Sequence, residues 1–205
     1  MVRKTKEDAE VTRLRIIDAA REVFLVRGVS RTTIEQIATQ ANVTRGAVYW
    51  HFNNKTELFE AMREQVFLPL IDLIDDSVLN ESRYDPLNSI EQYFCGIIQT
   101  LEQSITTQQT YEIMMTKCEY VEELAEVLQQ ILSTCQNIVR KLETIYARAA
   151  AKDLINSNHH PAQLALDTHL FFVGLLNMWI KDTECKYIRD NAIAIIRDHV
   201  QMKRK

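Results

Sequence analysis

Apolar residues recur at intervals of three and four along most of the chain, which is the spacing of one face of an α-helix. The first such face, in residues 11–27, consists of Ile16, Ala19, Ala20, Val23 and Phe24. Gly28 follows directly, and glycine readily takes the left-handed conformation that ends a helix. The pattern therefore predicts a first helix that stops at residue 27.

Short periodic segments come next and predict a helix-turn-helix arrangement. Thr32 or Thr33 is placed to cap a helix that ends near residue 41, and Thr44 can cap another over about 44–50. A longer helix follows from residue 53 or 54. Two short helices joined by a three- or four-residue turn are typical of helix-turn-helix proteins. The same spacing also occurs in plain helical bundles, so spacing alone leaves both interpretations open.

The remainder of the chain predicts long helices. Helical periodicity covers the segments 89–104, 109–118, 121–151, 161–181 and 186–203. Residues 80–88 are expected to form a loop and residues 156–160 a linker, and Pro69 is expected to bend or stop the fourth helix. The chain has only 4 Gly and 3 Pro, which favours long helices over many strands. We therefore expect an all-α fold of about nine helices.

The segment 161–181 is apolar on nearly all sides, so it needs two sets of packing partners. One set can belong to its own domain, and a second copy of the chain is the simplest source of the other. This predicts a two-fold homodimer through a four-helix bundle built from segments 161–181 and 186–203. The alternative is a monomer in which the 161–181 helix is fully central.

Composition excludes several classes of protein. No run of 18 apolar residues and no secretory leader is visible, so we expect a cytoplasmic protein with no membrane partner. No Ser/His/Asp set, paired carboxylates, phosphate loop or metal cluster is visible, so we expect no enzyme, cofactor or metal site. The four cysteines are scattered without ligand spacing and are expected to be small buried residues; oxidant sensing by one of them stays open.

The overall charge of −4 is unevenly distributed. Residues 1–60 carry ten Lys and Arg against eight Asp and Glu, whereas the rest of the chain carries fourteen against twenty. A surface that binds a polyanion is therefore expected near the N-terminus, although the excess of positive charge is small.

The third predicted helix carries residues suited to DNA. In a major groove, Arg45 could pair with a guanine edge, and Gly46 would let the backbone approach the sugar-phosphate chain. Thr44 could cap the helix and also bind a phosphate, and Tyr49 and His51 offer polar tips for phosphates. Val48 and Phe52 are expected in the core, and Trp50 has no clear assignment. Lys55, in the first turn of the next helix, would complete an anion site.

The run from about Thr12 to Phe59, with "VTRGAVYWHFNNKTELF", closely resembles the DNA-binding domain of TetR-family transcriptional repressors. The resemblance extends through "KCEYVEELAEV" (117–127) and "GLLNMWI" (174–180). Over this fuller length the chain resembles the AcrR/TtgR/MtrR-type repressors of multidrug efflux pump genes. The resemblance implies a homodimer with a DNA-binding domain at 1–55 and a ligand-binding and dimerisation domain at 56–205. The residues expected to bind operator DNA are Thr32, Thr33, Thr44, Arg45, Gly46, Tyr49, Trp50, His51 and Lys55.

The resemblance also implies a pocket for small hydrophobic or cationic effectors. By alignment it would be lined by Phe67, Tyr111, Met114, Met115, Gln130, Phe171 and Leu175. Methionine and aromatic walls suit varied apolar ligands, but a stripe of this kind is just as often plain core. Glu112 and Glu119 are the acidic residues available to balance a cationic compound.

The sequence thus predicts a ligand-responsive repressor of a palindromic operator, controlling a multidrug efflux operon and released from DNA by its effector. Two alternatives are a helical small-molecule-binding protein without a role in regulation and a cysteine redox-sensing regulator. The first leaves Arg45, Tyr49, His51 and Lys55 without a function.

Overall fold

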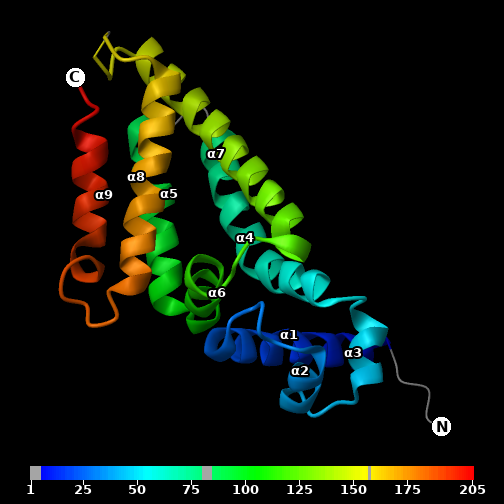
Figure 1. The fold of residues 1–205 in the computed structure, drawn as a ribbon. Helices are drawn as coiled ribbons and strands as arrows, with labels where there is room; N and C mark the ends of the chain where they lie inside the picture. The colour runs from blue at the N-terminus through cyan, green and yellow to red at the C-terminus, as the bar shows by residue number, and fades with distance from the viewer. Residues whose placement is uncertain (1–5, 80–84, 157) are drawn as a thin grey trace. The chain divides into compact units, whose positions relative to one another are not determined.

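The computed structural model describes residues 6–79, 85–156 and 158–205, without the side chains of residues 67–73 and 75–79. Helices account for the secondary structure of these residues, apart from one isolated bridge between Ile155 and Arg204. The helices, coloured along the chain in Figure 1, are α1 (Lys6–Arg27), α2 (Ile34–Gln40), α3 (Arg45–His51), α4 (Lys55–Leu79), α5 (Pro86–Gln103), α6 (Ile105–Thr116), α7 (Ala125–Ala151), α8 (Pro161–Lys181) and α9 (Ala192–Gln201), with short 3₁₀ turns η1 (Glu122–Leu124) and η2 (Arg189–Asn191). The predicted all-α fold is confirmed.

The chain divides into two compact units. The first contains residues 1–67 and 106–129, and the second contains residues 68–105 and 130–205. Two helices, α4 and α7, therefore run from one unit into the other. The predicted domain boundary at residues 55 and 56 stays a prediction.

The first unit packs α1, α2 and α3 around a small core. Phe24 of α1 is fully buried and meets the ring of Phe59 of α4 edge to face, with 6.2 Å between ring centroids. Gly28 ends α1 with φ of +80°, as the left-handed stop required. An added Cβ there would lie 3.3 Å from the backbone oxygen of Lys117, so close approach of a second segment also favours glycine.

Local hydrogen bonds set the starts of the two short helices. Thr33 caps α2 in a capping box, in which its hydroxyl accepts from the Gln36 amide and the Gln36 side chain accepts from the Thr33 amide. Thr44 caps α3 by accepting from the amide of Ala47 at 3.1 Å. These caps are encoded within four residues of sequence, and the predicted helix-turn-helix boundaries are accordingly close to those observed.

Arg21 is buried although the pattern of apolar residues placed it off the core stripe of the first helix. Its guanidinium donates to the hydroxyl of Thr110 at 3.2 Å, to Asp18 at 2.8 Å and to the side-chain oxygen of Gln65 at 3.1 Å. A buried charge needs such partners because burial without them is costly. One arginine thereby joins α1, α4 and α6 within the first unit.

The second unit brings α5, α8 and α9 together, and Figure 1 shows α8 and α9 side by side. Phe94 of α5 packs on Phe172 of α8 with ring centroids 4.2 Å apart. A buried polar chain joins α7 to α8 and α9, because the Thr168 hydroxyl lies 2.7 Å from the Tyr146 hydroxyl and 3.1 Å from Nε2 of His199. α7, α8 and α9 are thus linked by hydrogen bonds as well as by apolar contact.

Several helix boundaries differ from the sequence prediction. α9 begins at Ala192, not near residue 186, because the Asp182 carboxylate organises the preceding loop by accepting from the backbone amides of residues 186–189. These hydrogen bonds, with that from Ile188 the strongest, lower the pKa of Asp182 to about 2. α5 begins three residues early, at Pro86, because Asp85 caps it by accepting from the amide of Leu87. α4 continues past Pro69, so that proline does not stop the helix.

Three other predictions lie outside the described residues. They concern the side chain of Phe67, any bend at Pro69, and the part of the predicted loop that spans residues 80–84.

Candidate DNA interface

The short helix α3 presents two distinct faces. Val48 and the C-cap residue Phe52 are buried, as predicted, and hold the helix on the first unit. Arg13 of α1 lies over the Phe52 ring at 5.2 Å from its centroid. Arg45, Gly46, Tyr49 and Trp50 are exposed. The opposite face of α3 is therefore available to a partner.

Arg45 and Tyr49 form a pair on the exposed face of α3. Nη2 of Arg45 donates to the Tyr49 hydroxyl at 3.3 Å, and the guanidinium carbon lies 5.4 Å from the centre of the Tyr49 ring. The two residues are four positions apart, which places them on the same side of a helix. The hydrogen bond from Arg45 to Tyr49 raises the pKa of the already permanently charged guanidinium. Tyr49 thus restricts where Arg45 can point.

Gly46 has no structural reason to be glycine within the described part of the chain. Its φ is not in the left-handed region, and an added Cβ would meet nothing nearer than the Thr44 hydroxyl oxygen at 3.9 Å. Glycine inside a helix costs about 1 kcal/mol relative to alanine. A partner that approaches the helix backbone closely would explain why that cost is tolerated.

Trp50 extends from the helix with 73% of its surface exposed, and Tyr49 is 43% exposed. The Trp50 ring makes an edge-to-face contact with His51 at a centroid separation of 4.5 Å. A tryptophan side chain with this much exposed surface is unusual in a folded protein. Trp50 is therefore one of the exposed residues of α3.

The remaining predicted DNA contacts are placed differently. Thr32 is buried, and its hydroxyl donates to the backbone oxygen of Gly28 at 2.7 Å. The structure therefore gives the Thr32 side chain a role inside the α1–α2 turn. Thr33 is exposed but serves as the cap of α2. Lys55 begins α4, and its ammonium lies 3.0 Å from a carboxylate oxygen of Glu123.

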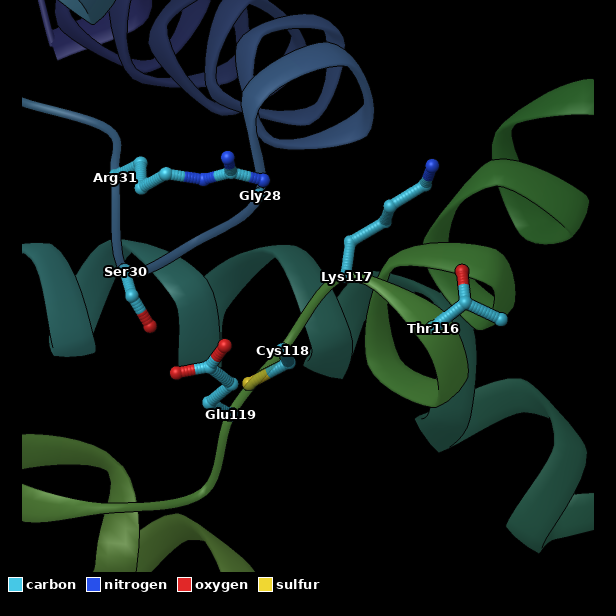
Figure 2. Close-up of a pocket in the computed structure, with 7 residues that line it drawn as sticks. All are labelled: Gly28, Ser30, Arg31, Thr116, Lys117, Cys118 and Glu119. Carbon is cyan, nitrogen blue, oxygen red and sulfur yellow. The ribbon is translucent and has the colours of Figure 1, made fainter.

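A cavity of about 400 Å³ lies between the α1–α2 turn and the segment that follows α6. Figure 2 shows Gly28, Ser30 and Arg31 on one side facing Lys117, Cys118 and Glu119 on the other. The two segments are joined by a backbone hydrogen bond from the amide of Val29 to the oxygen of Lys117, 2.9 Å long. The conspicuous "KCE" stretch of the sequence is thus part of the support of the helix-turn-helix.

The predicted effector-binding residues belong to both compact units. Tyr111 and Met114 are buried and Met115 half-buried in the first unit; in the second, Leu175 is buried, Phe171 half-buried and Gln130 exposed. The Phe171 ring stacks on His199 with centroids 3.8 Å apart. The side chain of Phe67 is outside the described residues. The cavity beside the "KCE" stretch is lined by none of these residues.

Cysteine burial bears on the redox alternative. Burial raises the pKa of Cys118 to about 11 and also raises the pKa of Cys95 and Cys135. A high pKa keeps these groups as thiols near neutral pH, and it is the thiolate that oxidants attack. The expectation that all four cysteines are buried holds for Cys95 alone, because Cys118 and Cys135 are half-buried and Cys185 is exposed. Cys185 lies in the open loop organised by Asp182.

The comparisons with known proteins agree with this geometry. Residues 16–62 match the family described as bacterial regulatory proteins, tetR family. Residues 85–204, more than half of the chain, match the C-terminal region of MAATS-type transcriptional repressors. The chain belongs to the TetR family. This is a family of transcriptional regulators, not of enzymes.

The individual relatives include a transcriptional regulator and a repressor of a multidrug efflux pump. The HTH-type transcriptional regulator TtgR of Pseudomonas putida is 47% identical over 92 residues. That match spans 45% of this chain and 43% of TtgR, so it covers less than half the length of either protein. NalD, the secondary repressor of the MexAB-OprM multidrug efflux pump in Pseudomonas aeruginosa, is 34% identical with a TM-score of 0.85 over 97% of this chain and 98% of its own.

A further similar structure contains a bound compound. The SmeT–triclosan complex is 26% identical to this chain with a TM-score of 0.82, covering 95% of this chain and 92% of its own. SmeT is the repressor of the Stenotrophomonas maltophilia multidrug efflux pump SmeDEF.

Within the described ranges, no helix is long and apolar enough to cross a membrane. The same residues include no group of three or more His, Cys, Asp or Glu placed to hold a metal ion.

Proposed function

We propose that this TetR-family chain is a ligand-responsive repressor that binds a palindromic operator as a homodimer in the cytoplasm. The observation that carries the proposal is the exposed face of α3. It combines Arg45, Tyr49 and Trp50 with Gly46, where the structure has room for a larger side chain, on a helix whose other face is buried. A helix that enters the major groove needs such a division between anchoring and reading residues.

The residues on and beside the exposed face of α3 have different tasks in this proposal. Arg45 reads a guanine edge with its forked donors, and Tyr49 orients that guanidinium. Gly46 allows close approach to the DNA backbone, while Thr44, Trp50 and His51 flank the groove. Lys55 adds a phosphate contact at the start of α4, together with the amides of its first turn.

We further propose that the regulated operon encodes a multidrug efflux pump and that small hydrophobic or cationic compounds release the repressor. Support comes from the relatives, since NalD and SmeT are both described as repressors of such pumps and SmeT has been solved with triclosan. The residues proposed to bind the effector are Phe67, Tyr111, Met114, Met115, Gln130, Phe171 and Leu175, most of which are methionine or aromatic. Effector and operator would favour different members of one conformational equilibrium, so each weakens the binding of the other.

The homodimer is proposed to form through α8 and α9. Exposed apolar side chains follow one side of α8 at Leu166, Leu170 and Val173. Gly174 lies beside them, and an added Cβ there would meet nothing within 4 Å. An exposed apolar stripe of this kind on a well-packed helix is typical of an interface with another subunit.

The proposal is tested by enriching duplexes from a random-sequence pool with the wild-type protein. We expect an inverted repeat, with half-sites about one helical turn or a multiple of it apart. In the Arg45→Ala variant, discrimination at one base pair of each half-site should fall by about 1–3 kcal/mol, while weak salt-sensitive binding persists. Arg31→Ala removes the same charge from the α1–α2 turn and should leave base preference unchanged.

Two outcomes would contradict the proposal. If no duplex is enriched, the rival function, a helical small-molecule-binding protein without regulation, gains support. If Arg45→Ala retains the full base preference, Arg45 does not read sequence.

A further inference from the structure

Lys55 has its ammonium group engaged by acceptors of this chain. Nζ lies 3.0 Å from Oε1 of Glu123 and donates to the backbone oxygen of Ser30 at 3.3 Å. The Lys55 side chain is only 14% exposed, whereas that of Glu123 is 53% exposed. The cation that the proposed function directs at a phosphate is therefore already paired in the protein without DNA.

Glu123 is held in place by its backbone. The Thr56 hydroxyl, next to Lys55, donates to the backbone oxygen of Glu123 at 3.3 Å. Leu124 follows as a buried residue and anchors the η1 turn. Contact with the first turn of α4 therefore comes from both the main chain and the side chain of Glu123.

The segment that carries Glu123 is attached to the helix-turn-helix at a second point. The amide of Val29, in the α1–α2 turn, donates to the backbone oxygen of Lys117 at 2.9 Å. Residues 117–124 thus contact both the turn before α2 and the start of α4. This gives the carboxylate of Glu123 a defined position beside Lys55.

We propose that Glu123 competes with the DNA backbone for Lys55 and so limits operator affinity; the inference rests on the proposed function. A carboxylate and a phosphate both accept charge-assisted hydrogen bonds from an ammonium group, and one lysine cannot neutralise both fully. On DNA, the phosphate replaces Glu123 as the main partner of Lys55. The free energy of the Lys55–Glu123 pair is then subtracted from that of operator binding.

The position of Glu123 in the chain gives this competition a regulatory consequence. α7 begins two residues later, at Ala125. A shift of the first turn of α7 that strengthens the Lys55–Glu123 pair weakens DNA binding, and a shift that breaks the pair strengthens it. Glu123 is in this sense a positioning residue that acts on DNA through Lys55.

The experiment measures the affinity of four proteins for a duplex enriched by the wild type: wild type, Glu123→Gln, Lys55→Met and the double variant. For this partly exposed ion pair we expect a gain of about two- to five-fold in affinity per subunit for Glu123→Gln. The same change should give no gain in the Lys55→Met background, because that variant has no ammonium group for Glu123 and a phosphate to compete for. Glu126→Gln, which removes the same charge one turn further on, should leave affinity within error of the wild type.

Thermal unfolding of the same proteins separates competition from a purely structural contact. Competition predicts that Glu123→Gln binds DNA more tightly while its melting temperature falls or stays unchanged. Weaker DNA binding together with a lower melting temperature would show that Glu123 merely supports the fold and would overturn the inference.

Two further results have distinct meanings. An equal gain of affinity in both Lys55 backgrounds would show that Glu123 only repels DNA at a distance, and the inference would fail while the proposed function stands. If the wild type itself enriches no duplex, all four proteins fail alike and the proposed function falls with the inference.

Discussion

At the scale of single residues, the division of α3 into two faces explains the unusual composition of "TRGAVYWHF". Val48 and Phe52 are buried, while Arg45, Tyr49 and Trp50 are exposed. The pairing of Arg45 with Tyr49 could not be read from the sequence with certainty, because a spacing of four permits the contact without requiring it. The structure shows that the Tyr49 hydroxyl accepts from Arg45.

Replacing Tyr49 by phenylalanine should therefore act through Arg45. Loss of a hydrogen bond to a charged group typically costs about 1.5–3 kcal/mol when buried, and this exposed bond should contribute well below that range. We expect a few-fold loss of discrimination at the base pair that Arg45 is proposed to read, with little change in binding to poly(dI-dC). The measurement is a comparison of affinities for the enriched duplex, a duplex substituted at that base pair, and the non-specific polymer.

Tyr187→Phe is the matched control, because Tyr187 is exposed in the loop before α9. It should change none of the three affinities. A uniform loss on all three DNAs with Tyr49→Phe would instead assign the Tyr49 hydroxyl to a phosphate.

At the scale of helices, the Tyr146–Thr168–His199 chain joins α7, α8 and α9 in a way that depends on the protonation of one imidazole. If Tyr146 donates to Thr168, the Thr168 hydroxyl is free to donate to Nε2 of a neutral His199. Burial, aided by Lys203 and opposed by Asp167, lowers the pKa of His199 to about 4. The folded protein thus holds this histidine neutral.

This pKa predicts a dependence of stability on pH. An unfolded histidine binds a proton near pH 6.5, whereas folded His199 does so only near pH 4, so the unfolded state binds more protons between these values. The stability contribution is complete above pH 6.5 and falls by about 3 kcal/mol as pH decreases to 4. Urea unfolding at a series of pH values should show this loss.

Substitution of His199 by glutamine should reduce that slope. Some slope should remain, because burial also lowers the pKa of His169. His159→Gln serves as control, since His159 is exposed in the linker before α8. An unchanged slope in His199→Gln would show that other groups dominate the acid sensitivity.

At the scale of the whole molecule, the proposed homodimer depends on the exposed apolar side of α8. Leu170, in the middle of that stripe, is 60% exposed. Burying such side chains against a second subunit contributes about 1.5–3 kcal/mol each. The same stripe has no apparent function in a monomer.

A charge on the stripe should therefore separate the subunits. We expect Leu170→Asp to sediment as a monomer at micromolar concentration while the wild type sediments as a dimer. Operator affinity should fall with it, because two recognition helices on one body bind two half-sites together. Analytical ultracentrifugation gives the first quantity and titration with the enriched duplex gives the second.

Leu132→Asp introduces the same charge at a leucine of α7 that is 45% exposed and should leave the dimer intact. A wild-type protein that sediments as a monomer would overturn the proposed interface.

Much of the fold could be predicted because helices are specified by short-range pattern. The first helix ends at residue 27 as predicted, and the bounds of α8 agree at both ends. Thr33 and Thr44 cap helices through partners within three residues. α9 was placed too early because the loop before it depends on one carboxylate, that of Asp182, which gathers four amides.

The candidate site could be predicted only in part, for the same reason. The anchoring role of Val48 follows from helical period, and so does the exposure of Arg45. The burial of Thr32 depends on a hydrogen bond across the α1–α2 turn. The Lys55–Glu123 pair joins residues 68 positions apart, and no local pattern distinguishes Glu123 from Glu122 or Glu126.

Sequence alone was therefore sufficient for features that arise from neighbours along the chain: the presence of most helices, the caps of α2 and α3, the two faces of α3 and the family resemblance. Tertiary packing was needed to establish which charged groups find partners. Arg21 is buried because α4 and α6 bring Gln65 and Thr110 to it, and Lys55 is paired because the segment after α6 returns to the start of α4. The physical reason is that helix periodicity depends on separations of three or four residues, whereas an ion pair depends on distance in space.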